Sequence, residues 1–106
     1  MKIGVVIGTN NPETCWNAFR FAVKALEGGH AVRTFLVGAG VECEGIREGS
    51  YDVPAQMQAF TEHGGGLLAC GTCLRSREME GSDLCPISTM QDLVDLTVWA
   101  DRLLTF

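Results

Sequence analysis

Two cysteines, Cys70 and Cys73, have the residue type and the spacing that sulfur or redox chemistry requires. They lie where an apolar segment ends and a helical segment over residues 74–78 begins. A cysteine at the start of a helix faces backbone N–H groups without intrahelical partners and the positive end of the helix dipole, and both favour the thiolate. The thiolate is the reactive form of cysteine. Arg75 and Arg77 are close enough in sequence to add to this effect.

The Cys70–Cys73 pair is compatible with several kinds of chemistry. Two thiols three residues apart can form a reversible disulfide, and one of them can instead carry sulfane sulfur as a persulfide. The pair can also supply half of a tetrahedral zinc site, with Cys43 or Cys85 completing the ligands, although structural zinc sites usually show two such pairs. Buried inert packing is the remaining alternative, since free cysteine is often buried. A thioredoxin-like protein is a weaker match, because no proline loop of the expected kind follows the pair.

The composition excludes several classes of function. The chain has 106 residues, of which 46% are hydrophobic and 20% charged, so we expect one globular domain over residues 1–106. A net charge of −5 argues against binding to a nucleic-acid backbone, because such proteins usually carry a basic face. No apolar run is long enough to span a bilayer, and residues 2–7 are too short and strand-like for a signal peptide.

The cysteine count fits a reducing compartment. Five cysteines are an odd number, and a core of this size needs no disulfides, so a disulfide scaffold is not expected. We therefore expect a cytoplasmic protein, because thiols stay reduced there.

The elements that must position the cysteines alternate between strands and helices. Apolar runs predict strands, and apolar residues at helical spacing predict the helices between them. Asn11 is the expected cap of the first helix, with Pro12 at its first position. The alternation predicts an α/β domain with a mainly parallel sheet. The expected elements are strand 2–8, helix 12–26, strand 30–38, loop 39–49, helix 53–63, strand 67–70, loop 79–87, a helix opened by a capping box of Ser88 and Gln91, and strand 102–106.

This order places most of the cysteines at one edge of the predicted sheet. In open α/β sheets the active crevice lies outside the carboxyl ends of the strands. Asn10 and Cys15 follow the first strand, Cys43 follows the second, and Cys70 and Cys73 follow the third. These residues are therefore candidates for one shared site, and whether they meet depends on the strand order, which the sequence does not give.

The chain resembles the DsrE/DsrF-like family of small sulfur-relay proteins, which includes the TusB, TusC and TusD subunits. The resemblance covers essentially the whole chain and rests on the order and spacing of five groups of residues. These groups are residues 2–7 with 11–14, residues 15–26, residues 35–38 with 40–42, residues 68–74, and residues 100–106.

The resemblance implies a fold and a role for Cys70. It implies a three-layer α/β/α sandwich with a mainly parallel sheet of four to five strands, assembled as a homotrimer, a hexamer or a hetero-oligomer. It also implies that the cysteine at the end of the strand before the short helix carries a persulfide, and Cys70 matches that position. Cys73, Cys15, Cys43 and Cys85 match no obligatory residue of the relay subunits.

The leading hypothesis from the sequence is therefore an intracellular sulfur-relay protein. Cys70 would be the carrier and Cys73 a resolving thiol or second acceptor, while the N–H groups of Gly71 and Thr72 hydrogen-bond the persulfide. No cofactor is expected, and the partners would be donor and acceptor proteins of sulfur together with further copies of the chain. Two alternatives stay open: a dithiol redox protein, and a non-catalytic oligomeric binding module with packed cysteines or a metal held by Cys70, Cys73, Cys85 and Cys43.

Overall fold

The five strands of the protein form one parallel sheet in the order β4-β3-β2-β1-β5. A computed structural model describes residues 1–106. The predicted α/β class, with a mainly parallel sheet of four to five strands, is confirmed. The strands are β1 (Lys2–Ile7), β2 (Ala31–Leu36), β3 (Gly66–Cys70), β4 (Ile87–Ser88) and β5 (Arg102–Thr105).

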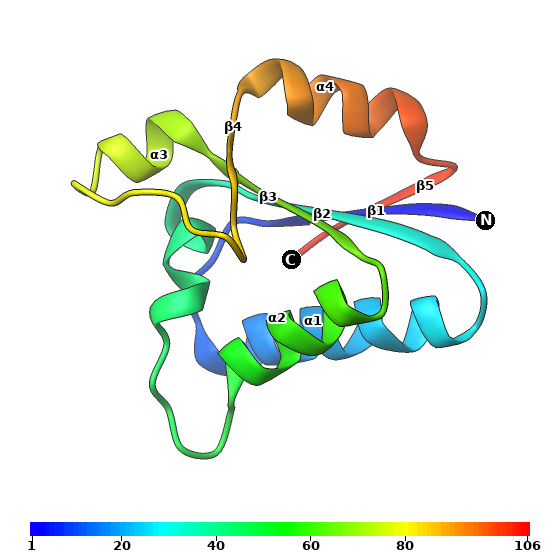
Figure 1. Ribbon diagram of the computed structural model, residues 1–106, viewed down its shortest axis with the longest axis horizontal. Coiled ribbons are helices and arrows are strands. Elements are labelled where there is room, and N and C mark those ends of the chain that lie inside the picture. Colours follow the sequence, from blue (N-terminus) through cyan, green and yellow to red (C-terminus); the bar gives the residue numbers. More distant parts are fainter.

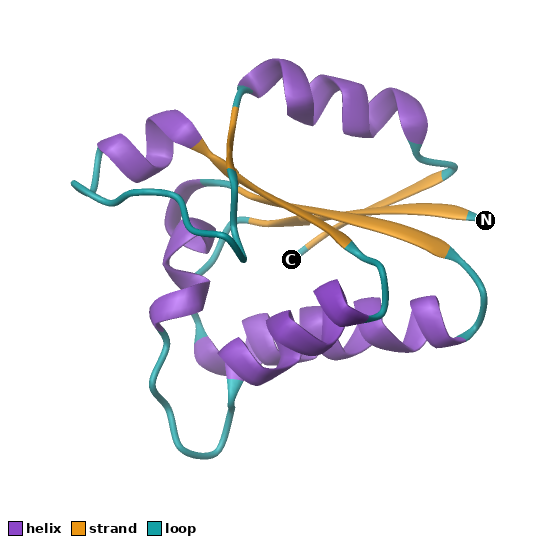
Figure 2. Ribbon diagram, viewed as in Figure 1, coloured by secondary structure: helices purple, strands orange, loops and turns teal.

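Helices cover both faces of this sheet and give it three layers (Figures 1 and 2). Helices α1 (Pro12–Glu27) and α2 (Val53–Glu62) lie on one face, and α4 (Met90–Trp99) lies on the other. The short helix α3 (Gly71–Arg75) extends beyond the end of β3, at the carboxyl edge of the sheet. The layered arrangement places the Cys70–Cys73 segment at the edge where the crevice of an α/β sheet is expected.

The two faces of the sheet are packed to very different extents. Against α1 and α2, the side chains of Val5 and Ile7 are fully buried together with Phe19 and Phe60, whose rings meet edge to face at 5.9 Å between centroids. On the opposite face, Leu96 is the only buried residue of α4. The main core therefore lies between the sheet and the α1–α2 layer.

The helix caps follow the predicted chemistry, with one shift in position. Asn11 caps α1 and accepts a hydrogen bond from the N–H of Thr14, as expected. The predicted capping box of Ser88 and Gln91 is wrong by one residue, because Thr89 and Asp92 form it. Ser88 is unavailable as a cap since it pairs within β4 and its hydroxyl donates to the carbonyl of Ala69.

The segment after β2 is the main departure from the sequence prediction. A loop was expected over residues 39–49, but Gly38–Gly45 forms a 3₁₀ helix, η1. This helix packs against the end of β1, and Gly40 makes the approach possible: a Cβ atom there would lie only 2.8 Å from the carbonyl carbon of Ile7. Apolar periodicity could not reveal such an element, because a short 3₁₀ helix held by a glycine contact has no amphipathic stripe.

The two-residue strand β4 was also missed, because residues 79–87 were expected to form a loop. It pairs with β3 through Ala69 opposite Ile87 and Cys70 opposite Ser88. Two residues carry no alternation that a sequence could show. The pairing nevertheless matters, since it fixes the backbone beside Cys70.

Candidate functional site

Cys70 and Cys73 lie on opposite sides of the junction between β3 and α3. Cys70 is the last residue of β3 and the N-cap of α3, with an extended backbone, and Cys73 lies in the first turn. Gly71 fits the junction closely, since a Cβ atom there would make a tight contact of 3.0 Å with the carbonyl oxygen of Ser88 in the neighbouring strand. Cys70 therefore directly precedes the backbone N–H groups of the first turn of α3.

The surroundings of Cys70 favour its thiolate. Burial, with 2% of the residue exposed, opposes ionisation, but hydrogen bonds from the Cys73 thiol and from the N–H groups of Cys73 and Thr72 outweigh it. Together with the positive charge of Arg75 they lower the pKa of Cys70 below the ordinary value for a thiol. A nucleophilic thiolate at this position was the central expectation from the sequence.

The sulfur of Cys73 has its own donor, which comes from another part of the chain. The backbone N–H of Gly38, at the start of η1, donates to Cys73 Sγ at an N···S distance of 3.1 Å. Gly38 has a φ of 56°, in the left-handed region that favours glycine, and this conformation directs its N–H toward α3. Cys73 is partly exposed, whereas Cys70 is buried.

A pH profile of alkylation tests the lowered pKa of Cys70. The thiolate fraction of a group rises as pH increases through its pKa, so a lowered pKa keeps Cys70 reactive at lower pH than an ordinary cysteine. We expect its iodoacetamide reaction to reach half its maximum below pH 9.0, the unperturbed value. The variant Arg75→Gln removes a stabilising charge and is expected to move the midpoint upward. Equal midpoints in the two proteins would contradict a role for Arg75.

The two arginines near the pair play different parts. Arg75 lies beside Thr72 and lowers the pKa of Cys70, as the sequence suggested. The same expectation for Arg77 is wrong, because its guanidinium Nε forms an ion pair with Glu42 of η1 at 2.8 Å. Arg77 also donates to the carbonyl of Cys73 at 3.2 Å. Its role is therefore to tie α3 to η1.

Glu42 is the centre of this tie between η1 and α3, which lie side by side at one end of the sheet (Figure 1). Hydrogen bonds from Arg77 and then from Asn10, whose amide lies 3.4 Å away, lower the pKa of the Glu42 carboxyl. Asn10 was expected among the residues of the candidate site. In the structure the Asn10 amide contacts Glu42. Glu42 binds Arg77, which in turn donates to the carbonyl of Cys73.

Cys15 and Cys43, which were also expected at this edge, form a separate pair. Their Sγ atoms lie 3.1 Å apart, and both sulfurs lie within hydrogen-bonding distance of the Thr9 carbonyl. No hydrogen bond joins them to Cys70 or Cys73.

The alternative of a metal held by Cys70, Cys73, Cys85 and Cys43 is not supported by the geometry. The structure contains no group of three or more His, Cys, Asp or Glu side chains that could hold a metal ion. Cys43 is turned toward Cys15, and Cys85 lies in the loop before β4. Burial and the nearby negative charge of Glu44 raise the pKa of Cys85 to about 12, which keeps it a thiol. The four sulfurs belong to three different surroundings.

Comparisons with known proteins agree with the resemblance seen in the sequence. A model of the DsrE/DsrF-like family matches residues 1–106. This chain belongs to the DsrE/DsrF-like family. An uncharacterized protein of Methanopyrus kandleri is 30% identical over 100 residues, which cover 89% of this chain and 83% of that protein. The crystal structure of the YchN protein of E. coli superposes with a TM-score of 0.86 at 26% identity, covering 100% of both chains.

The family is of the sulfur-relay type, and its members work with partner proteins. In this DsrE/DsrF-like chain, the contacts that sequence reasoning missed are the Gly38 N–H on Cys73 and the Arg77–Glu42 tie. Thirty-five residues separate each pair. The signal that could have suggested the first contact is that β2 and β3 are consecutive strands, whose carboxyl ends meet if they are also neighbours.

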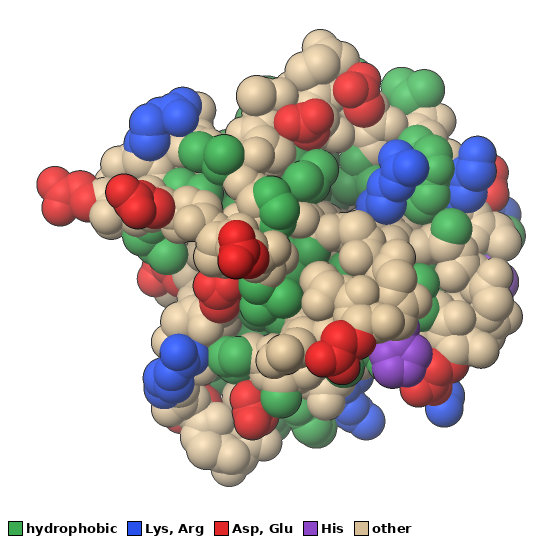
Figure 3. Space-filling view, in the orientation of Figure 1, with side chains coloured by type: hydrophobic (Ala, Val, Ile, Leu, Met, Phe, Trp, Pro, Cys, Tyr) green, Lys and Arg blue, Asp and Glu red, His purple; other side chains and the backbone are tan.

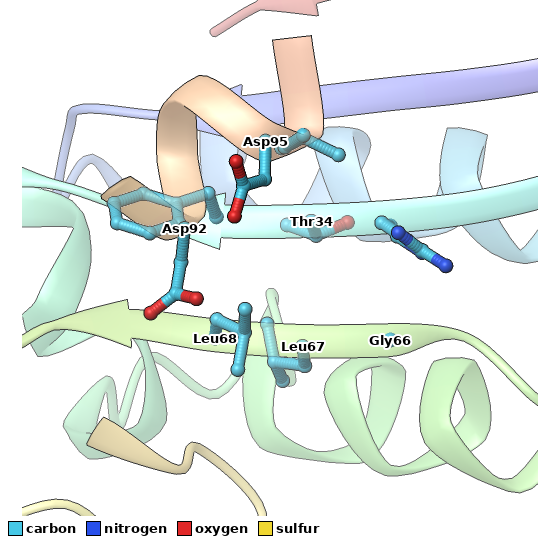
Figure 4. A pocket seen from close by; sticks show the side chains of 9 residues that line it. Thr34, Gly66, Leu67, Leu68, Asp92 and Asp95 are labelled. Carbon is cyan, nitrogen blue, oxygen red and sulfur yellow. The ribbon is translucent and has the colours of Figure 1, made fainter. Parts of the chain in front are cut away.

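The DsrE/DsrF-like chain has two hollows of interest on the α4 side of the sheet. A groove of about 440 Å³ lies between α4 and strands β2 and β3, with Asp92 and Asp95 above Leu68, and no cysteine lines it (Figure 4). A second hollow of about 330 Å³ is lined by Thr72 and Arg75 of α3 and by residues 87–90. The second hollow lies beside the candidate site. None of the helices combines the length and the apolar character that a membrane-spanning helix requires.

Proposed function

We propose that this chain is a cytoplasmic sulfur-relay protein that carries sulfane sulfur as a persulfide on Cys70, within a single domain spanning residues 1–106. The observation that carries the proposal is the position of Cys70 at the end of β3 and at the N-cap of α3, beside the backbone N–H groups of the first turn. The same N–H groups are placed to stabilise a persulfide anion in that position. All five cysteines are free thiols, which fits the reducing conditions of the cytoplasm.

Loading is a simple displacement. The Cys70 thiolate attacks the outer sulfur of a donor persulfide, the new bond forms between Cys70 Sγ and that sulfur, and the donor's own sulfur–sulfur bond breaks. The donor leaves as a thiolate, so no oxidant, reductant or cofactor enters the step. In the reverse sense, an acceptor thiolate takes the outer sulfur and regenerates the Cys70 thiolate.

Cys73 offers two fates for the sulfur, and its position supports both. As the more exposed thiol, it can take the outer sulfur from Cys70 and present it to an acceptor. It can also attack the inner sulfur of the Cys70 persulfide, which forms a Cys70–Cys73 disulfide and expels hydrosulfide. The second route is favoured by the short spacing of the two thiols, one at the N-cap of α3 and the other in its first turn. Such a chain would discharge sulfur as well as deliver it.

Mass spectrometry after brief exposure to polysulfide tests the proposal. Trypsin cuts after Arg47 and Arg75, so Cys70 and Cys73 fall in one peptide, residues 48–75, separate from the other three cysteines. We expect this peptide to gain one sulfur atom, with fragmentation assigning it to Cys70. A peptide whose mass falls by two hydrogens contains a Cys70–Cys73 disulfide, formed either by dithiol redox chemistry or by discharge of a persulfide. Release of hydrosulfide identifies the second route. Sulfur on the Cys85 peptide instead would contradict the proposal.

We also propose that the chain forms a homo-oligomer, trimer or hexamer, through its α4 side. Large apolar side chains there are exposed, and Val98 is the most exposed at 81%. Figure 3 shows hydrophobic side chains at the surface over α4 and in the middle of the face that carries β4. Exposed apolar groups gathered on one side usually mark an interface. The other exposed large apolar side chains on this side are Ile87, Met90, Val94 and Leu103.

Sedimentation tests this assembly. The variant Val98→Asp places a charge on the exposed apolar surface without disturbing the core, so we expect it to sediment as a smaller species than the unaltered chain. Glu27→Gln, on the opposite layer, is the control and is expected to leave the assembly intact. A monomeric unaltered chain would contradict the proposal.

A further inference from the structure

The buried pair Cys15 and Cys43 is not used by the proposed relay, yet its geometry is that of a dithiol ready to react. The two Sγ atoms are 3.1 Å apart, close enough for the Cys43 thiol to donate to Cys15. Neither side chain is exposed. Two sulfurs at this distance need to approach by only about 1 Å to reach the length of a disulfide bond.

The pair is held from both sides by different parts of the chain. Cys15 belongs to the first turn of α1, and its sulfur lies 3.2 Å from the carbonyl oxygen of Thr9. Cys43 belongs to η1, which reaches this place through the close packing of Gly40 on the end of β1. The contact therefore joins two elements that follow neighbouring strands. Its position is set by the packing of the backbone of η1 on β1.

We propose that Cys15 and Cys43 form a second redox-active dithiol, which peroxide converts to an intramolecular disulfide independently of Cys70 and Cys73. The proposal goes beyond the sulfur relay and does not rest on it. The hydrogen bond that Cys43 donates to Cys15 also differentiates the two thiols. The Cys43 thiol lowers the pKa of Cys15, whereas the same contact and burial raise the pKa of Cys43. Cys15 is accordingly the first nucleophile.

The reaction with hydrogen peroxide balances without any other reagent. The Cys15 thiolate attacks one peroxide oxygen, the O–O bond breaks, and Cys15 becomes a sulfenic acid. The other oxygen leaves as hydroxide, which takes up the proton that the Cys15 thiol had released and becomes water. Cys43 then attacks the sulfenic sulfur, the disulfide forms, and the sulfenic oxygen leaves as water after taking the proton of Cys43. The two thiols are oxidised by two electrons in total, and the peroxide is reduced to two molecules of water.

The disulfide would clamp η1 onto α1. The amide of Gly38 and the carboxylate of Glu42, which contact Cys73 and Arg77, both belong to η1. Oxidation of the buried pair therefore fixes the segment that supports the candidate site. It also closes the chain between residues 15 and 43, which restricts the unfolded state and stabilises the folded one.

Peptide mapping of the full chain after peroxide treatment tests the proposal. Trypsin places Cys15 in residues 3–20 and Cys43 in residues 34–47, whereas Cys70 and Cys73 share residues 48–75. We expect a cross-link between the first two peptides under non-reducing conditions, which dithiothreitol removes. The melting temperature of the oxidised chain is expected to rise by about 10 °C or more.

Two variants complete the design. Cys43→Ser is expected to lose both the cross-link and the rise in melting temperature, while Cys85→Ser, another buried cysteine outside the pair, keeps both. The mapping of the unaltered chain decides the matter even if Cys43→Ser does not fold. The proposal would be overturned if Cys15 and Cys43 were both recovered as alkylated free thiols while Cys70 and Cys73 formed a disulfide. A cross-link between other peptides would do the same. Sulfur loading of Cys70 is read from a different peptide, so failure of one proposal is distinguishable from failure of the other.

Discussion

Replacement of Cys70 by serine is expected to reduce sulfur loading by polysulfide at least about 100-fold, because the hydroxyl of serine is a far weaker nucleophile than a stabilised thiolate. The substitution is small and keeps a hydrogen-bonding group at the N-cap of α3, where serine is itself a favoured residue. The fold should therefore survive, and loss of loading would report on chemistry. The measurement is the sulfur content of residues 48–75 after exposure to polysulfide.

Cys73→Ser is the matched variant, since it also replaces one cysteine sulfur by an oxygen within residues 48–75. It removes the second thiol but leaves the N–H groups of Thr72 and residue 73 aimed at Cys70. We expect Cys70 still to be loaded with sulfur and its persulfide to live longer than in the unaltered chain. Hydrosulfide release is expected to fall to the level of a control without protein. Loading that is equal in Cys70→Ser and in the unaltered chain would exclude Cys70 as the carrier.

Substitution of Gly40 by alanine is expected to destabilise the fold by about 3 kcal/mol or more, a cost at the upper end of those for overpacking. The added Cβ atom would overlap the Ile7 carbonyl oxygen and lie 2.8 Å from the carbonyl carbon. Both are backbone atoms of a central strand, so no side chain can move aside to relieve the clash. Either η1 must lift from β1 or the end of β1 must shift.

Gly45→Ala is the control for this substitution, because Gly45 ends the same 3₁₀ helix and a Cβ atom added there would meet no atom within 4 Å. Urea denaturation of the two variants gives the difference in the free energy of unfolding. We expect Gly45→Ala to lie within about 0.5 kcal/mol of the unaltered chain, as is usual for surface substitutions. Equal stability of the two variants would show that η1 is not packed on β1 in solution.

The sequence was informative where structure depends on local patterns. The buried strands β1 and β2 and the cap of α1 by Asn11 follow from apolar runs and from hydrogen-bonding chemistry within a few residues. The position of Cys70 at the end of β3 was predicted for the same reason. Each of these features is decided by residues that are adjacent in the chain.

The features that could not be predicted depend on contacts between distant segments. The distance between Cys15 and Cys43 follows from the packing of η1, which itself follows from a glycine contact with β1. The sequence predicted that four cysteines leave the carboxyl edge of the sheet, but not whether they meet there. The sheet order then separates them into two pairs, because α1 and α3 lie on different sides of that edge. Spacing along the chain contains no information about this division.

The position of β5 has a consequence for how the molecule forms. This strand, residues 102–105, follows the other four in the chain and pairs with β1, so that Ile3 lies opposite Arg102 and the N–H of Gly8 donates to the carbonyl of Phe106. Every other strand pair is also joined through a crossover, and loop closure must precede pairing in such a sheet. During synthesis the edge of β1 that faces β5 therefore keeps its backbone N–H and C=O groups unpaired until residues 102–105 leave the ribosome. Among these five strands, β1, against which η1 packs, therefore gains its second neighbour only after β2, β3 and β4 have been made.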